Sequence, residues 1–418
     1  MQYRLSRRGI SRASLRFVAM LASVAACVMA RPAAARAQDP GAEPSVYLLT
    51  MGPGDQVWEK FGHNAIWIHD PVRGTDRVYN WGIFDMSEPG FMRRFLKGRM
   101  RYWMQPMELD RTLYEYSYFN RSVYAQELNM TPAQKQALQE FVTWNAQAEN
   151  RYYLYDYFRD NCSTRVRDAL DRALGGVIRQ TLEPRETGTT YRWHTRLLLG
   201  EFLPLYTGIQ LGLGENTDEP LNAWEEGFLP LRLRDQIRNV MVFDSTGAAV
   251  PLVKSERTLF EAQRPPLPTE PPNRLIPFLI VGLLVGGVLA GLGYLGRRSK
   301  LARFGFFTLA LAWTLVVGIF GTIINLLWLA TDHWATYRNE NVLQANFLFL
   351  VLFVCLTGMA FRARWAGTKA RHITLIIAGL ATLGFFIQVI PGVDQVNGEI
   401  IALLLPATLG LASRTDRD

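Results

Sequence analysis

The last third of the chain holds five apolar stretches, and they limit the possible folds more than any other feature. They cover roughly residues 275–295, 304–331, 342–361, 373–390 and 397–412 of the 418 residues. An apolar run of about 20 residues is long enough to cross a bilayer as a helix, whose backbone groups are hydrogen-bonded internally. We therefore expect residues 274–418 to form an all-α membrane bundle of about five helices, the fourth and fifth of them short.

The basic residues between these stretches predict the orientation of the bundle. Eight Lys and Arg side chains lie in the segments at 297–303 and 362–372, whereas the segments at 330–341 and 391–397 carry only Arg338. Segments rich in Lys and Arg stay in the cytoplasm. The sequence thus predicts a multi-pass protein of the bacterial inner membrane with its soluble domain in the periplasm.

Residues 1–37 have the pattern of a signal peptide. Basic residues precede an apolar run at 17–30, and Ala35-Arg36-Ala37 forms a small-x-small cleavage site. The leader holds seven arginines, which together with the eight basic residues of the two loops makes 15 of the 45 Lys and Arg residues. The net charge of +8 therefore marks membrane topology and does not indicate that the protein binds nucleic acid.

Residues 38–264 are expected to form a soluble α+β domain, and residues 265–273 a Pro-rich linker to the bundle. Runs of β-branched and aromatic residues predict strands at 46–50, 64–69, 77–84, 99–107 and 122–128. Helices are expected at 109–118, at 131–148 and from about residue 162 to Gly175-Gly176. The segment at 241–260 is expected to be a hairpin that turns at 244–247.

Cys162 is expected at the start of the third of these helices, with Asp160 or Asn161 as the N-cap. The positive end of the helix dipole and nearby amides favour a thiolate there, which is how a cysteine nucleophile is prepared. Because the other two cysteines lie in the leader and in an apolar stretch, Cys162 has no disulfide partner in the soluble part. The alternative is a small buried cysteine with a structural role.

A cysteine nucleophile needs a base, and His63, which follows a glycine at the head of a predicted strand, is the candidate. Asn80 on the neighbouring strand is the candidate to hold the imidazole, with His69 and Asp85 as competitors. Amides at the start of the cysteine helix would supply part of an oxyanion hole. The alternatives are that His63 is an ordinary surface or core histidine and that Asn80 is a turn or strand-edge asparagine, neither with a catalytic role.

Three further residues are candidates for binding a phosphate headgroup or an amine. Asp332 and His333 follow the second apolar stretch on the outer side, and Arg165 lies on the cysteine helix. The alternatives are an interfacial cap for the first two and a solvated arginine for the third. His, Cys and carboxylate residues do not cluster at metal-ligand spacing, so we expect neither a metal nor a cofactor.

Four segments together resemble the Lnb-type family, which has an N-terminal periplasmic domain followed by membrane helices. They are Phe61-Gly62-His63-Asn64-Ala65, Tyr79-Asn80-Trp81-Gly82-Ile83-Phe84-Asp85, Asn120-Arg121-Ser122-Val123-Tyr124 and Asp160-Asn161-Cys162-Ser163-Thr164-Arg165. The chain is more distantly similar to the circularly permuted NlpC-like and lecithin:retinol acyltransferase-like thiol enzymes. That similarity implies a permuted papain-like fold in which the histidine precedes the cysteine.

The resemblance spans roughly residues 45–260 and implies lipoprotein N-acylation. In this reaction an acyl chain moves from a membrane phospholipid to the α-amine of a diacylglyceryl-cysteine lipoprotein. Cys162 would be the nucleophile and His63 the base, whereas the resemblance does not fix the third residue. Two readings remain beside it: a periplasmic cysteine peptidase or amidase that acts on peptidoglycan or a peptide, and a non-catalytic binding module anchored in the membrane.

Overall fold

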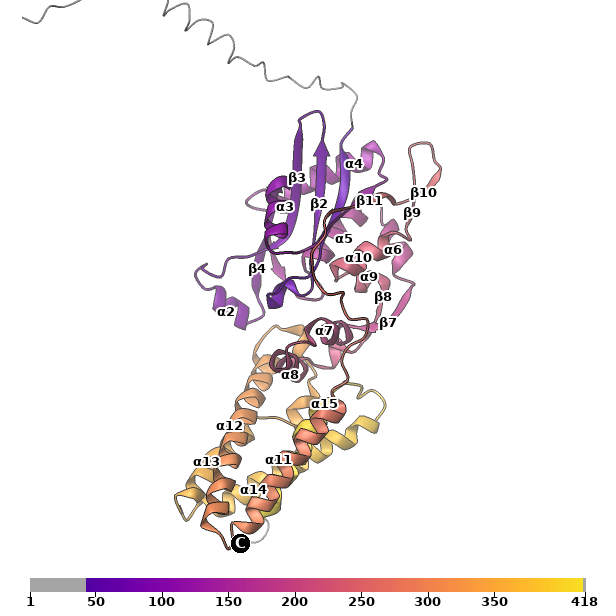
Figure 1. Ribbon diagram of the computed structural model, residues 1–418. Coiled ribbons are helices and arrows are strands. Elements are labelled where there is room, and N and C mark those ends of the chain that lie inside the picture. Colours follow the sequence, from indigo (N-terminus) through magenta and orange to yellow (C-terminus); the bar gives the residue numbers. More distant parts are fainter. Residues whose placement is uncertain (1–42, 416–418) are drawn as a thin grey trace, which may run out of the picture. The chain divides into compact units, whose positions relative to one another are not determined.

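The computed structural model describes residues 43–415 and contains a sheet domain and a bundle of apolar helices (Figure 1). The predicted leader at 1–37 lies outside the described residues. The first part of the described chain is α+β, as predicted, and the last part is helical. Within the described residues, four helical segments are long and apolar enough to cross a membrane.

Seven strands form one sheet in the order β11-β5-β1-β2-β3-β4-β6. Their bounds are β1 (Ser45–Met51), β2 (His63–Asp70), β3 (Thr75–Ile83), β4 (Met100–Glu108), β5 (Val123–Leu128), β6 (Tyr152–Tyr155) and β11 (Val253–Phe260). The five predicted strands correspond to β1 to β5, so those predictions are confirmed. β6 and β11 add the two edges of the sheet, and they pair with β4 and β5.

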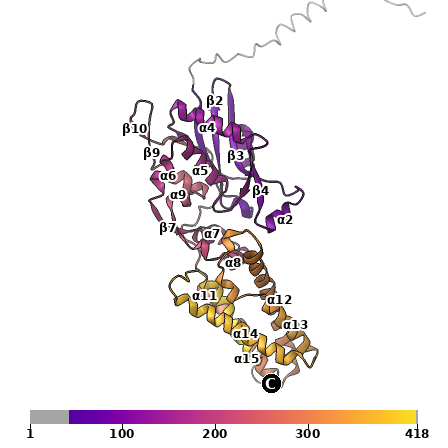
Figure 2. The ribbon, with the colours of Figure 1, turned by 180° about the vertical axis from the view of Figure 1, so that it is seen from behind.

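Helices and short elements fill the connections of the sheet domain. Their bounds are η1 (Val57–Glu59), α2 (Phe91–Leu96), α3 (Leu109–Tyr118), α4 (Pro132–Asn145), α5 (Cys162–Ala173), α6 (Val177–Leu182), β7 (Glu186–Thr190), α7 (Tyr191–Leu199), α8 (Leu203–Gly212), η2 (Glu215–Thr217), β8 (Pro220–Asn222), α9 (Ala223–Glu226) and α10 (Pro230–Ile237). The predicted helices are α3, α4 and α5. Figure 2 shows α4, α5, α6 and α9 across one face of the sheet.

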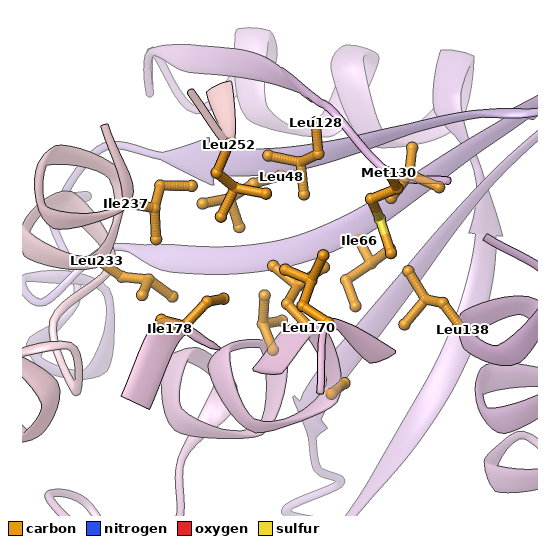
Figure 3. Packing of buried hydrophobic residues seen from close by; sticks show 14 of the residues in the cluster. Leu48, Ile66, Leu128, Met130, Leu138, Leu170, Ile178, Leu233, Ile237 and Leu252 are labelled. Carbon is orange, nitrogen blue, oxygen red and sulfur yellow. The ribbon is translucent and has the colours of Figure 1, made fainter. Parts of the chain in front are cut away.

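The two faces of the sheet bury two separate apolar clusters, because side chains of a strand alternate between faces. Leu48 and Ile66 point toward α5 and α6, where they pack with Leu170 and Ile178 in the main core (Figure 3). Leu49, Ala65 and Trp67 lie in the second cluster, against which Leu109, Leu113 and Tyr116 of α3 pack. The odd-numbered residues of β2, His63 among them, therefore face α3.

The predicted hairpin over 241–260 is only partly correct. β9 (Met241–Phe243) and β10 (Ala249–Pro251) pair with each other around the turn at Asp244–Gly247. β11 then leaves this small sheet and pairs with β5 from Val253 opposite Leu128 to Phe260 opposite Val123. The edge of the main sheet offered β11 more backbone hydrogen bonds than the short hairpin could.

The bundle contains α11 (Leu275–Leu295), α12 (Lys300–Ala330), α13 (Leu348–Ala360), α14 (Ala366–Phe386) and α15 (Gly398–Thr415), with short turns η3 (Trp334–Thr336), η4 (Glu340–Leu343) and η5 (Ile387–Val389). The four membrane-capable segments begin at Leu275, Lys300, Glu340 and Ala366, and α15 is shorter. α15 packs closely on α11, because a Cβ added at Gly282 or Gly286 would strike its backbone. The prediction of about five helices is met by four such segments and this shorter helix.

Two loops of the bundle are hydrogen-bonded to the α8 segment of the sheet domain. Asn339 Nδ2 donates to the carbonyl oxygen of Leu211 (2.9 Å), and Gln395 Nε2 donates to that of Leu213 (3.1 Å). These are the two loops with few basic residues. Their contact with the sheet domain agrees with the orientation that the positive-inside pattern predicts.

Candidate active site

Cys162 is the first residue of α5, and Asn161 is its N-cap, one of the two residues predicted for that position. Asn161 Oδ1 accepts hydrogen bonds from the backbone N–H groups of Ser163 (2.8 Å) and Thr164 (3.0 Å). The Asn161 side chain also donates to the carbonyl oxygen of Phe228 (3.0 Å). These bonds satisfy free amides of the first turn and hold the start of α5, with its thiol, in one orientation.

His63 and Asn80 meet across the adjacent strands β2 and β3. The distance between His63 Nε2 and Asn80 Oδ1 is 3.2 Å, and Asn80 is buried. Asn80 Nδ2 donates to the carbonyl oxygen of Val78 (3.1 Å), which leaves Oδ1 to accept from the imidazole. Nε2 therefore carries the proton of the neutral ring, and Nδ1 is the nitrogen with a free lone pair.

The start of the cysteine helix meets the strand of His63 at Asn64. The backbone N–H of Asn64, the residue that follows His63, acts on the pKa of the Cys162 thiol and favours its charged form. The side-chain amide of Asn64 also lies 3.0 Å from the hydroxyl oxygen of Ser163, which is 99 positions away in the sequence. The structure thus places Asn80 against His63 and brings the start of the Cys162 helix to Asn64, the residue next to His63.

A bulge in β3 makes room for the thiol. The pairing of β3 with β4 shifts register between Asn80 and Ile83, and Gly82 has a φ of +90°. A Cβ added at Gly82 would lie 3.3 Å from Cys162 Cβ and 3.6 Å from the Tyr155 ring. Only glycine combines this backbone conformation with such a close approach.

A Gly82→Ala variant is expected to lose most of its Cys162 reactivity, about 10- to 100-fold, because small displacements of a reacting group carry penalties of this size. The measurement is the rate of Cys162 alkylation by iodoacetamide, followed by intact-protein mass spectrometry. Gly247→Ala is the matched control, since Gly247 has a φ of +83° with nothing within 4 Å of an added Cβ. Equal alkylation rates for both variants would mean that the close approach of Gly82 to Cys162 does not matter, and that the glycine is needed only for its positive φ.

Burial determines the protonation of the pair. It raises the pKa of the Cys162 thiol, although the amides of Asn64 and Ser163 and the charge of Arg121 act in the opposite direction. Burial, and then the charge of Arg121, lowers the pKa of His63 to about 4. The resting pair at neutral pH is a thiol and a neutral imidazole. The expected resting thiolate is wrong here, because loss of hydration outweighs the amides of the helix start.

Two residues of the site were not predicted as functional. The Tyr116 ring of α3 stacks against the His63 ring with centroids 6.3 Å apart, and the Arg121 guanidinium lies 4.7 Å above Tyr116. Arg121 is buried, pairs with Glu59 at 3.3 Å and donates from Nε to the carbonyl oxygen of Gly52. The sequence could have pointed to Arg121, because this residue lies in one of the four family segments. Nothing in the sequence singles out Tyr116.

The two competitors for the third position lie outside the site. His69 Nδ1 is 2.8 Å from Asp76 Oδ1, at the other end of β2. Asp85 is exposed, and its carboxylate accepts hydrogen bonds from the backbone and the hydroxyl of Ser87 (2.8 and 2.6 Å). Asn80 is therefore the candidate that the structure brings to His63.

The three residues predicted to bind substrate make other contacts. The Asp332 carboxylate pairs with Arg99, and His333 Nε2 donates to the carbonyl oxygen of Phe95 (2.9 Å). Arg165 pairs with Asp160 on its own side of α5, with Nη2 and Oδ2 2.6 Å apart. None of these three contacts involves Cys162, and the role of the three residues in binding stays a prediction.

A cavity of about 450 Å³ borders α5 away from the thiol. Thr164 and Arg167 of α5 line it together with Trp224 and Trp334, whereas Cys162 and His63 do not. Among the described residues, no group of three or more His, Cys, Asp or Glu side chains is arranged to hold a metal ion. The chemistry of the site is that of a thiol, an imidazole and backbone amides.

Comparison with known proteins gives one match. Residues 31–196 match the model of the Lnb N-terminal periplasmic domain. No curated protein and no solved structure matches the chain, so the permuted papain-like arrangement stays a prediction. The match contains the strand of His63, the bulge of Gly82 and the helix of Cys162. Residues 31–196 therefore carry a domain of the Lnb N-terminal periplasmic family.

Proposed function

We propose that the protein is a membrane-bound cysteine acyltransferase, which moves an acyl chain from a phospholipid to the α-amine of a diacylglyceryl-cysteine lipoprotein. The observation that carries the proposal is the hydrogen bond between the side chains of Asn64 and Ser163 (3.0 Å), because it joins the start of the Cys162 helix to the strand that begins with His63. The family of the periplasmic domain and the apolar helices support a substrate that resides in the membrane.

In the first step the thiol takes the acyl group. His63 Nδ1 accepts the proton of Cys162 as Sγ attacks the ester carbonyl carbon of the phospholipid. The amides of Asn64, Cys162 and Ser163, which favour the charged form of the thiol, would also provide donors for the negative oxygen that develops. The C–O bond of the ester then breaks, the leaving alkoxide takes the proton from His63, and a thioester remains on Cys162.

In the second step the amine of the lipoprotein resolves the thioester. The neutral α-amine attacks the thioester carbonyl carbon and loses a proton to His63. The C–S bond breaks, the thiolate recovers that proton, and the products are an amide and the resting enzyme. Asn80 acts through His63 in both steps, because it keeps the proton of the neutral ring on Nε2 and the lone pair on Nδ1.

Anchoring in the membrane would contribute to the rate. Both proposed substrates are held in the same bilayer as the enzyme, so their encounter with the thiol is confined to its surface. The single residue Arg274 separates the Pro-rich linker from the start of α11, and its side chain donates to the carbonyl oxygen of Gly200 (2.7 Å). This contact ties the sheet domain to the outer end of α11 and limits how far it can move from the membrane.

The test is expression in a bacterial strain that lacks its own lipoprotein N-acyltransferase, followed by mass spectrometry of the N-terminal peptide of one lipoprotein. The wild-type chain is expected to add one acyl chain as an amide, with both glyceryl esters retained. A Cys162→Ala variant is expected to add none. Cys355→Ala is the matched control, because Cys355 is the other cysteine of the described residues and is buried in α13.

Three results would contradict parts of the proposal. N-acylation by the Cys162→Ala variant would exclude a thioester on this residue. An N-acylated lipoprotein that retains only one glyceryl ester would show that the donor is the lipoprotein's own ester and not a phospholipid. Cleavage of peptidoglycan or of a peptide without acyl transfer would favour the cysteine peptidase or amidase.

A further inference from the structure

The short helix α2 exposes apolar side chains next to basic ones. Met92 and Leu96 are 62% and 59% exposed, and the neighbouring Phe95 is 36% exposed. Arg93 and Lys97, on the same turns, are also exposed. Figures 1 and 2 both show α2 projecting from the sheet beside β4. Exposed apolar residues interleaved with Arg and Lys are typical of an element that lies in the interface of an anionic bilayer.

The end of α2 is tied to the outer end of a membrane-capable helix. α12 ends at Ala330, and the Asp332 N–H donates to the carbonyl oxygen of Lys97 (2.8 Å). His333 Nε2 donates to the carbonyl oxygen of Phe95. Gly98 is packed against the Asp332 backbone so tightly that an added Cβ would lie 2.7 Å from the His333 nitrogen. Because a spanning helix ends at the bilayer surface, these contacts hold α2 at that level.

A row of aromatic rings leads from α2 to the thiol. Its members are Phe95, Phe91, Phe84, Tyr102 and Tyr155. The centroids of successive rings are 6.2, 6.1, 4.9 and 4.4 Å apart. The last ring, Tyr155, lies beside the bulge at Gly82, against which Cys162 packs. The row therefore joins the exposed apolar face of α2 to the catalytic candidate by a continuous series of ring contacts, in which Phe91 and Tyr102 are buried.

We infer that α2 lies in the outer leaflet of the membrane and that the row of rings guides a lipid acyl chain from there to Cys162. The partner is the surface of a bilayer that contains anionic phospholipid. The negative headgroups attract Arg93 and Lys97, and the acyl chains accommodate the apolar side chains of Met92 and Leu96. The inference names the route by which the substrate reaches the thiol, and this part rests on the proposed function. It also assigns Asp332 and His333 to positioning α2.

The position of α2 can be tested without any acyl transfer. A full-length variant that lacks native cysteines, with Cys27→Ala, Cys162→Ser and Cys355→Ala, receives Leu96→Cys or Phe243→Cys and a nitroxide label. In vesicles of phosphatidylglycerol and phosphatidylethanolamine, the label at 96 is expected to collide more with oxygen, and the label at 243 more with a water-soluble nickel chelate. Phe243 is the control because it is 70% exposed in β9. Equal nickel collision at both positions would overturn the inference.

The route to the thiol is tested by a Met92→Glu, Leu96→Glu double variant. Acylation of Cys162 by phospholipid vesicles is expected to slow about tenfold or more, because the apolar contact with the bilayer is lost. Acylation by a water-soluble acetyl ester should stay within about twofold, since neither side chain touches the thiol. The matched control is Met241→Glu, Phe243→Glu in β9, both exposed apolar residues.

The experiments distinguish failure of the proposed function from failure of the inference about α2. If the soluble ester also acylates the double variant more slowly, the change has disturbed the site and the guiding role is wrong. If vesicles acylate the double variant as fast as the wild type, the route is wrong. If vesicles do not acylate the wild-type thiol at all while the label at 96 still meets oxygen, the proposed function and the guiding role fail together and the interfacial position of α2 stands.

Discussion

A His63→Ala variant is expected to acylate Cys162 about 10²- to 10⁴-fold more slowly than the wild type, the range that a positioned general base contributes. The physical reason is the neutral resting pair: burial raises the pKa of the thiol, so a thiolate forms only if a base takes the proton during attack. The measurement is single-turnover formation of the acyl-enzyme in lipid vesicles, read as a mass increase of the intact protein.

The pH dependence of the same rate tests which form of His63 is active. Its pKa is lowered to about 4, so the imidazole accepts a proton throughout the neutral range and stops doing so as the pH falls through about 4. The expected acid limb therefore lies near pH 4. A limb near the ordinary histidine pKa of about 6.5 would contradict the buried environment found here.

His69→Ala is the matched control for this variant. His69 lies on the same strand and also bonds an acceptor through its ring, but that acceptor is Asp76. Its removal is expected to leave the acylation rate and the acid limb unchanged. If His69→Ala and His63→Ala slow the reaction equally, the loss reflects damage to β2, and the role of His63 as base would have to be abandoned.

The helix of Cys162 was predictable because its signals are local. Asn161 caps the first turn and Gly175 and Gly176, with positive φ, follow its end, so both boundaries depend on residues within a few positions. The strand of His63 was predictable for the same reason. What joins them is the contact of Asn64 with Ser163, 99 positions away in the sequence, and the four family segments indicated that contact where periodicity could not.

The unpredicted part of the site depends on packing between distant elements. Tyr116 reaches His63 only because α3 covers the face of the sheet to which odd-numbered residues of β2 point. The protonation of Cys162 was mispredicted because the dipole argument used the helix alone. The neighbours that bury the thiol, Gly82 and Tyr155 among them, come from other strands.

An Arg192→Met variant is expected to lose about 3–5 kcal/mol of stability, because it leaves a buried carboxylate without its partner. Arg192 is 1% exposed, and its Nε donates to Asp218 Oδ1 (2.7 Å) while Nη2 donates to the carbonyl oxygens of Leu213 (3.1 Å) and Gly214 (3.0 Å). Asp218 Oδ2 in turn accepts from the Val396 N–H of a bundle loop (3.3 Å). Loss of the guanidinium therefore disturbs the contact between sheet domain and bundle as well as the fold.

The readout is the midpoint of heat denaturation of the full-length protein in detergent, with Arg179→Met as control. Arg179 pairs with Glu183 on the surface, where solvent screens the attraction and the pair contributes little to stability. Burial already raises the pKa of Asp218, with Arg192 acting against it. Without Arg192, the pKa of Asp218 in the folded protein rises further above its value in the unfolded chain. The loss of stability in the variant should therefore grow as the pH rises through the folded-state pKa and shrink at lower pH. A deficit independent of pH would mean that the lost hydrogen bonds to the carbonyls, and not the unpaired charge, account for the destabilisation.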